Sequence, residues 1–252
     1  MLLAAGRGER MRPLTDTTPK PLLPVRGKPL MQWPLEALAR AGVGRVVVNT
    51  AWLGEQIPAQ FGSDFAASTP GRATVHIDYS CEGQDFGGAL ETGGGIVRAL
   101  PLLNDVFWVL AGDVFAPEFV FSPEALQRFV ESDCLAHLWL VPNPEHNPRG
   151  DFGLGPVPQA VGQPGLALNL SATDPAPRFT YSTIGLFRKN LFAPPWCAIP
   201  SGNPNGVKAS VVPMLRAAMD QGLVSAELYT GPWTDVGTPE RLAQLQPPIF
   251  SA

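Results

Sequence analysis

The chain has 252 residues, of which 45% are hydrophobic, and a formal net charge of −4. This length and composition fit one α/β domain over residues 1–252 better than two independent ones. The charge excludes a basic nucleic-acid footprint, no apolar run reaches the ~18 residues that span a bilayer, and no signal-peptide pattern is present. We therefore expect a soluble, cytoplasmic protein with no nucleic-acid or membrane partner.

The N-terminal segment is the most informative part of the chain. Short apolar residues run directly into a loop with two glycines and three arginines, namely Gly6, Gly8, Arg7, Arg10 and Arg12. Glycine adopts backbone angles closed to other residues, so successive N–H groups can turn inward and form an anion-binding concavity. The pattern predicts a polyphosphate site. For this fragment alone, the alternative is an ordinary turn with solvated arginines.

A lysine held between two prolines follows this loop. Pro19 and Pro21 stiffen the chain around Lys20, because proline fixes its own φ and restricts the residue before it. This lowers the ordering cost of holding one ammonium group against phosphate oxygens. We therefore predict that Lys20 binds phosphate.

Strand-like and helical stretches alternate along the chain. We expect strands over 45–49, 75–79, 106–110 and 136–141, and helices around 30–41, 93–100 and 122–131. The alternation predicts an α/β fold with a Rossmann-like, mostly parallel central sheet flanked by helices. Pro34 indicates that the first helix starts late or kinks, and Gly42 is suited to end it. Stretches rich in proline and glycine at 142–177 and 193–206 predict loops and insertions.

Two carboxylates stand out at positions where a ligand of a parallel sheet would lie. Asp113 follows the expected strand 106–110 and a glycine, and ligands bind beyond the carboxyl ends of such strands. Asp235 lies in Gly231-Pro232-Trp233-Thr234-Asp235-Val236-Gly237-Thr238, with Thr238 and Pro239 suited to open a helix. Two carboxylates can hold Mg²⁺, which prefers a few oxygen ligands plus substrate phosphates. Taken alone, Asp113 is also typical of a turn.

The remaining reactive side chains carry no expected chemistry. The cysteines, Cys81, Cys134 and Cys197, are widely spaced and indicate free thiols. His76, His137 and His146 are interpreted as incidental packed or surface residues.

The glycine-rich opening and the Pro19-Lys20-Pro21-Leu22 segment resemble, at this spacing, the signature of the sugar-phosphate nucleotidyltransferases. These enzymes couple a sugar 1-phosphate to a nucleoside triphosphate and release pyrophosphate. The resemblance implies the nucleotide-diphospho-sugar transferase fold, with a nucleotide-binding part at about 1–115 and a sugar-binding part at about 116–238. It also implies Mg²⁺ held by Asp113 and Asp235, and a direct displacement that needs positioning and electrostatic stabilisation.

A narrower resemblance covers nearly the whole chain. It rests on Ala51-Trp52-Leu53-Gly54, Leu90-Glu91-Thr92-Gly93-Gly94-Gly95-Ile96, Arg149-Gly150-Asp151-Phe152 and Tyr181-Ser182-Thr183-Ile184-Gly185. Together these segments look like the uridylyltransferases that act on N-acetylmuramate 1-phosphate in cell-wall recycling. The alternative for the glycine triplet is relief of crowding at the start of a helix.

The resemblance assigns roles residue by residue. The expected UTP contacts are Ala4, Gly6, Gly8, Glu9, Arg10, Lys20 and Gly93. The expected sugar contacts are Ala111, Gly150 and Asp151. The expected catalytic residues are Lys20 and Asp113. Beyond the roles that the resemblance assigns, Arg12 is a further catalytic candidate, at the α-phosphate.

The chain departs from the family pattern in three places. Ala111 stands where relatives often carry an asparagine that can touch the sugar. The segments 81–90 and 153–178 are longer than expected for the family. The start is abrupt, and we hypothesise that the true start lies upstream and that a longer chain would be more stable. One alternative is an enzyme that uses another substrate pair, such as glucose 1-phosphate with dTTP or UTP, or mannose 1-phosphate with GTP. The other is a non-catalytic nucleotide-sugar-binding protein. We expect a monomer or a weak homo-oligomer.

Overall fold

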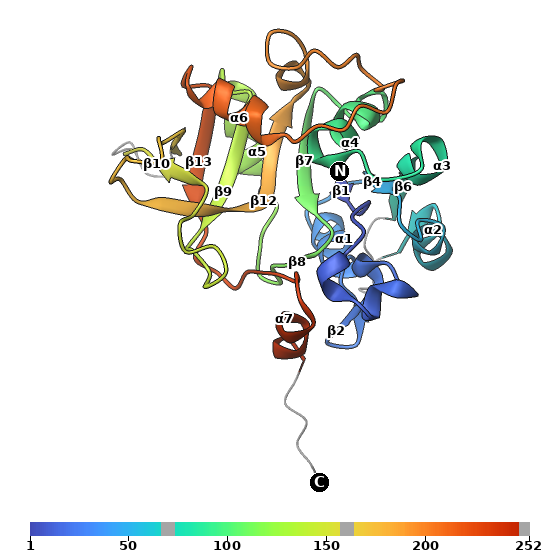
Figure 1. Cartoon of the computed structure of the whole chain (residues 1–252). Helices are drawn as coiled ribbons and strands as arrows, with labels where there is room; N and C mark the ends of the chain where they lie inside the picture. The colour runs from blue at the N-terminus through green and yellow to red at the C-terminus, as the bar shows by residue number, and fades with distance from the viewer. Residues whose placement is uncertain (67–73, 157–163, 247–252) are drawn as a thin grey trace. The chain divides into compact units, whose positions relative to one another are not determined.

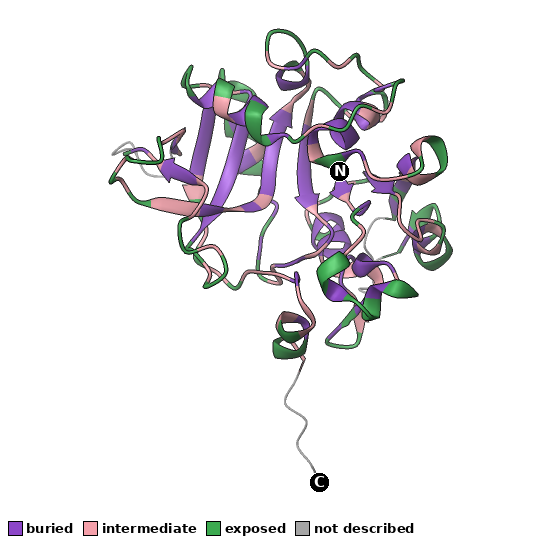
Figure 2. Ribbon diagram, viewed as in Figure 1, coloured by how far each residue is buried: buried purple, intermediate pink, exposed green. Residues whose placement is uncertain are grey.

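The computed structural model describes residues 1–66, 74–156 and 164–246, and the chain forms two compact units (Figure 1). Unit 1 holds Met1, Leu90–Leu110 and Ser122–Gly231. Unit 2 holds Leu2–Ala89, Ala111–Phe121 and the chain from Pro232 onward. In each unit the long strands are mostly buried, drawn purple in Figure 2, and the helices expose their outer faces. Residues 157–163 of the expected 153–178 insertion lie outside the described residues.

The larger sheet of unit 2 runs in the order β1-β4-β6-β5, and the glycine loop follows β1 directly. The strands are β1 (Leu2–Leu3), β4 (Arg45–Thr50), β6 (Val75–Cys81) and β5 (Asp64–Phe65). Both β1 with β4 and β4 with β6 pair in parallel, while β5 pairs antiparallel with β6. The valines of β4 are buried, as β-branched residues are in a covered parallel strand.

Short elements complete unit 2. Its α-helices are α1 (Gln32–Arg40), α2 (Gln56–Phe61), α3 (Glu82–Phe86) and α7 (Pro239–Gln244). Two-stranded ribbons join β2 (Pro24–Val25) to β3 (Lys28–Pro29) and β8 (Val114–Phe115) to β14 (Thr234–Asp235). Single 3-10 turns are η1 (Glu9–Met11), η2 (Leu14–Asp16) and η3 (Lys20–Leu22).

A hydrophobic cluster ties the three chain segments of unit 2 together. It consists of Met11, Leu23, Val25, Leu30, Phe115, Val236 and Leu242, with Trp33 and Leu245 packed against it. Met11 belongs to the glycine loop, Phe115 follows Asp113, and Val236 follows Asp235. The burial of these apolar side chains therefore fixes the positions of the polar residues beside them.

Unit 1 is a mixed sheet in the order β10-β11-β13-β9-β12-β7. The strands are β10 (Phe152–Leu154), β11 (Gly165–Leu168), β13 (Val224–Leu228), β9 (Ala136–Val141), β12 (Arg178–Arg188) and β7 (Val106–Ala111), whose last residue belongs to unit 2. The helices are α4 (Glu91–Ala99), α5 (Pro123–Glu131), α6 (Val212–Met219), η4 (Leu100–Leu102) and η5 (Lys189–Phe192). α6 packs against β11 and β13.

The α/β class with a central sheet and flanking helices is confirmed, as are the four expected strands and the three expected helices. The mostly parallel pairing holds in unit 2. In unit 1 the prediction of a mostly parallel sheet is wrong. There β9 and β13 pair in parallel, but β12 pairs antiparallel with β7, β9 and β10. The 142–177 stretch is not all loop, since it carries β10 and β11.

Helix boundaries follow their expected signals. α1 begins at Gln32, which places Pro34 in its first turn, where its missing N–H costs no helical bond. Gly42 ends this helix with φ +80°. At α7, Thr238 caps the helix by accepting from the Arg241 N–H, and Pro239 follows as the first helical residue. No helix in the described part of the chain has the length and apolar character needed to cross a bilayer.

Candidate active site

The glycine loop is closed on itself by Gly8. This residue has φ +67° and ψ +37°, a left-handed conformation that favours glycine, and it opens the 3-10 turn η1. Its carbonyl accepts from the Met11 N–H at 2.9 Å and from the buried Thr15 hydroxyl at 2.8 Å. A Cβ at Gly8 would lie 3.0 Å from Thr15 Cγ2. A side chain at position 8 would therefore disturb the curvature of the loop.

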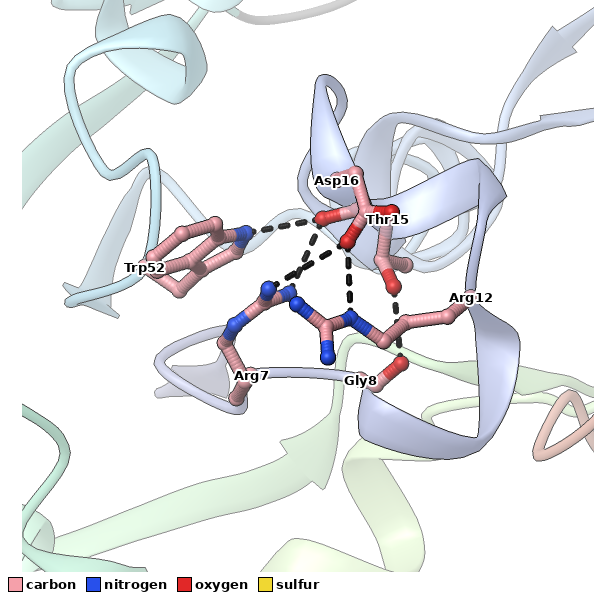
Figure 3. A network of polar contacts seen from close by, with 6 residues as sticks. All are labelled: Arg7, Gly8, Arg12, Thr15, Asp16 and Trp52. Atoms are coloured by element: carbon pink, nitrogen blue, oxygen red, sulfur yellow. Dashed lines mark hydrogen bonds and ion pairs between the residues drawn. The ribbon is translucent and has the colours of Figure 1, made fainter.

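Arg7 braces the loop from outside. Its guanidinium lies 3.5 Å from the centre of the Trp52 ring and donates to the Thr15 carbonyl at 3.0 Å, and Trp52 Nε1 donates to the same carbonyl at 2.9 Å (Figure 3). Arg12 Nε donates to Asp16 Oδ1 at 2.8 Å, and this hydrogen bond lowers the pKa of Asp16. Arg7 and Arg12 are thus held by contacts within the unit, and both form ion pairs with the Asp16 carboxylate.

We expect Trp52→Ala to lower the free energy of unfolding by about 1–3 kcal/mol, because it removes a cation–π contact and a hydrogen-bond donor. Trp52→Phe keeps a ring under Arg7 and loses only the Nε1 donor, so its loss should be smaller. Urea unfolding of both variants measures this order. Equal stability of wild type and Trp52→Ala would show that the contacts of Trp52 do not contribute to the free energy of unfolding.

Lys20 lies in a buried turn. It opens η3 after the extended Pro19, and its side chain is only 11% exposed. Its Nζ forms a salt bridge with Asp113 Oδ2. The stiffened segment therefore brings the lysine to the strand-end carboxylate, two residues that are 93 positions apart in sequence.

A cavity of about 240 Å³ brings most of the expected nucleotide residues of unit 2 together. Its lining consists of Gly6, Gly8, Glu9, Arg10, Met11, Lys20, Asp113 and Gly237. Two glycines, a lysine and an arginine border one space here, which is the composition of a phosphate site.

Asp235 ends the short strand β14, and Asp113 immediately precedes its partner strand β8. β14 pairs with β8, with Asp235 opposite Val114, and the Val236 N–H donates to the Asp113 carbonyl at 2.9 Å. Asp235 Oδ1 accepts from Arg241 Nη1 at 2.5 Å. The sequence predicted both carboxylates; the ribbon that joins them could not be read from it.

These carboxylates fit a divalent cation in part. Both supply the hard oxygen ligands that Mg²⁺ prefers, and the space beside Asp113 is bordered by phosphate-type donors. Among the described residues, no group of three or more His, Cys, Asp or Glu side chains could hold a metal. Substrate phosphates and water are ligands that Mg²⁺ commonly takes beside a few carboxylates.

The remaining expected contacts lie elsewhere. Ala4 is buried and donates its N–H to Asn49 Oδ1 at 2.8 Å, while Ala111 ends β7. The glycine beside Asp113, Gly112, lies against the Leu3 carbonyl, to which it donates at 2.8 Å. A Cβ there would come within 3.1 Å of the Leu3 oxygen, so this glycine serves close strand packing.

Three expected contacts lie in unit 1. Gly93 is buried in α4, and a Cβ there would come within 2.9 Å of the Ala209 carbonyl, as the crowding alternative describes. Gly150 has φ +62°. The Asp151 carboxylate accepts from the Tyr181 N–H at 2.8 Å and fixes its loop to β12. Their substrate roles stay predictions.

Sequence reasoning missed the supporting residues. Arg241 was not singled out, although the Thr-Pro pair before it marks the helix start that places it. Buried Asn49, whose Nδ2 donates to Glu82 Oε1 at 2.6 Å, gave no signal beyond a polar residue at a strand end. Trp52 was noted only as part of a family segment.

Comparison with known proteins agrees with this geometry. The family profile described as "Nucleotidyl transferase" matches residues 1–155. The chain belongs to the nucleotidyltransferase family. The sequence-based resemblance is thereby confirmed, and this nucleotidyltransferase is an enzyme of the class expected from its glycine loop.

Relatives and solved structures agree with this assignment. This nucleotidyltransferase is 44% identical over 252 residues to N-acetylmuramate alpha-1-phosphate uridylyltransferase of Neisseria meningitidis serogroup B, covering 98% of this chain and 96% of the relative. It is 30% identical over 244 residues to a mannose-1-phosphate guanylyltransferase of Mycobacterium tuberculosis, covering 95% and 61%. A crystal structure of a putative glucose-1-phosphate thymidylyltransferase from Bacillus anthracis, in complex with a sucrose, has a TM-score of 0.71 at 20% identity, covering 97% and 92%, and shows the same fold.

Proposed function

We propose that this enzyme transfers UMP from UTP to N-acetylmuramate 1-phosphate, giving UDP-N-acetylmuramate and pyrophosphate, as a step of peptidoglycan recycling. The observation that carries the proposal is that the glycine loop, Lys20 and Asp113 border the same cavity. The choice of uridine and N-acetylmuramate is supported by the relative from Neisseria meningitidis, which matches across nearly the full length of both chains.

The residues of the cavity divide the work of a displacement at phosphorus. The backbone of the glycine loop and the Arg10 guanidinium would hold the triphosphate oxygens. The Lys20 ammonium would leave Asp113 for a phosphate, where it stabilises the negative charge of the transition state. Such a reaction needs positioning and charge stabilisation and no covalent nucleophile.

Asp113 and Asp235 are the residues that would hold Mg²⁺. When bound, the ion would neutralise charge on the α-phosphate during attack by the sugar 1-phosphate oxygen. The sugar contacts assigned to Ala111, Gly150 and Asp151 are part of the same proposal. The Asp151 carboxylate also accepts from the Tyr181 N–H, which would hold its loop in place for the sugar.

Pyrophosphate release tests the proposal. UTP, dTTP, GTP, CTP and ATP are crossed against the 1-phosphates of N-acetylmuramate, N-acetylglucosamine, glucose and mannose, with Mg²⁺ present and in its absence. We expect selective release with UTP and N-acetylmuramate 1-phosphate. A preference for GTP and mannose 1-phosphate would move the activity to that of the Mycobacterium tuberculosis relative, and UTP binding with no release for any pair would identify a non-catalytic binding protein.

A further inference from the structure

Each of the two candidate metal ligands, Asp113 and Asp235, already forms an ion pair with a cationic side chain. Lys20 pairs with Asp113, and Arg241 pairs with Asp235, where Nη1 donates to Oδ1 at 2.5 Å and to the Asp235 carbonyl at 3.1 Å. The Arg241 and Asp235 side chains are 14% and 26% exposed. This second pair is therefore well shielded from solvent, where a charge interaction is stronger than at the surface.

The chain around Asp235 is built to place the Arg241 guanidinium. Thr238 caps α7 through the Arg241 N–H, which fixes the first turn of the helix. A Cβ at Gly237 would meet Arg241 Nη2 and Cζ, so a side chain at position 237 would displace the guanidinium from its present place. The Gly-Thr-Pro-Glu-Arg segment, residues 237–241, thus positions one cation on one carboxylate.

Opposite charges are balanced around the cavity. Glu9, Asp113, Arg10 and Lys20 line the cavity. The Asp235–Arg241 pair lies within four residues of the lining residue Gly237, so three carboxylates stand against three cations. A divalent cation that reaches this group of residues meets no excess of negative charge. It also finds no set of three ligand side chains among the described residues.

We propose that Arg241 is a positioning residue that neutralises Asp235 in the nucleotide-free enzyme, so that a divalent cation binds only with the triphosphate. The inference rests on the proposed function, because it needs the triphosphate to supply anionic oxygens and to draw Lys20 away from Asp113. Arg241 meanwhile keeps the Asp235 carboxylate in one orientation. Metal uptake is thereby tied to the arrival of substrate.

The proposal predicts opposite results for two substitutions. Arg241→Gln removes a cationic partner of Asp235, the guanidinium at 2.5 Å, so the nucleotide-free protein should bind Mn²⁺ at least ~10-fold tighter than wild type. Losing the fixed orientation of Asp235 lowers Mn²⁺ affinity only slightly. Losing the repulsion between the guanidinium and the ion raises it more, because the ion carries two charges. Arg241→Lys keeps the charge, so its Mn²⁺ affinity should stay within about 3-fold of wild type, whereas a purely structural role would move both variants alike.

The experiment titrates nucleotide-free protein with Mn²⁺ and measures free Mn²⁺ by electron paramagnetic resonance. Arg45→Gln is the matched control, because it removes one arginine from another ion pair of unit 2, with Asp78 at 2.5 Å, outside the cavity. We expect millimolar or weaker binding by wild type and by this control. Tight binding by nucleotide-free wild type, or no tightening in Arg241→Gln, would overturn the proposal.

The same titration separates the two proposals. It requires no turnover, so an enzyme inactive with every substrate pair would refute the proposed function while the effect of Arg241 on Mn²⁺ remained measurable. If Arg241→Gln fails to fold, the wild-type titration with and without UTP still decides once the Mn²⁺ bound by the same concentration of UTP alone is subtracted, because equal Mn²⁺ affinity in both conditions contradicts the coupling to substrate.

Discussion

Replacing Asp113 with asparagine should lower kcat for pyrophosphate release at least ~100-fold, the size of effect seen when an electrostatic contact to a transition state is lost. Asparagine keeps the shape of the side chain and removes its charge, so both the metal ligand and the partner of Lys20 are weakened. Asp235→Asn should have a similar effect. The measurement is kcat at saturating UTP, sugar 1-phosphate and Mg²⁺.

Asp78→Asn is the control for this pair. Asp78 lies in the same unit and forms an ion pair with Arg45, away from the cavity, so its loss should leave kcat near that of wild type. Near-normal turnover in Asp113→Asn or in Asp235→Asn would remove that residue from the metal site. A large fall in the Asp78 variant would instead point to a general loss of structure.

Replacing Lys20 with methionine should lower kcat/KM for UTP by ~100-fold or more, with KM raised and kcat reduced. Methionine has a similar length and fills the same space, whereas the ammonium group is lost from a side chain that is only 11% exposed. Because the lysine would contact phosphate in the bound and the transition states, both constants should change. Steady-state kinetics with variable UTP measures them.

Lys28→Met is the matched control for this substitution. Lys28 pairs with Glu36 at 2.6 Å and lies over the Trp33 ring in the same unit, outside the cavity lining. Its kinetic constants should stay close to those of wild type. A Lys20→Met enzyme within about 3-fold of wild type in kcat/KM would contradict the phosphate role of Lys20.

Local sequence signals sufficed where local physics decides the structure. The valine run of β4, the Thr238 cap of α7 and the glycine that ends α1 were each predictable from a few neighbouring residues. The strand β12 was not, because its register shifts between Tyr181 and Gly185 and this irregularity breaks the alternation that marks a strand. Its antiparallel pairing depends on segments far away in sequence.

The same distinction holds at the site. Gly8, Lys20 and Asp113 were predictable because each requires a recognisable residue type in a short motif. The pairing of Asp235 with Arg241 and the stacking of Arg7 on Trp52 depend on how helices and loops meet after folding. A row of arginines in the sequence predicted phosphate contacts, but two of the three, Arg7 and Arg12, are engaged with the loop itself.

The most direct test of the proposed activity is identification of the products from UTP, N-acetylmuramate 1-phosphate and Mg²⁺ by phosphorus NMR. The account predicts UDP-N-acetylmuramate and pyrophosphate in equal amounts, formed only when both substrates are present. Hydrolysis of UTP without a nucleotide sugar, or no reaction while other nucleotide and sugar pairs react, would contradict it.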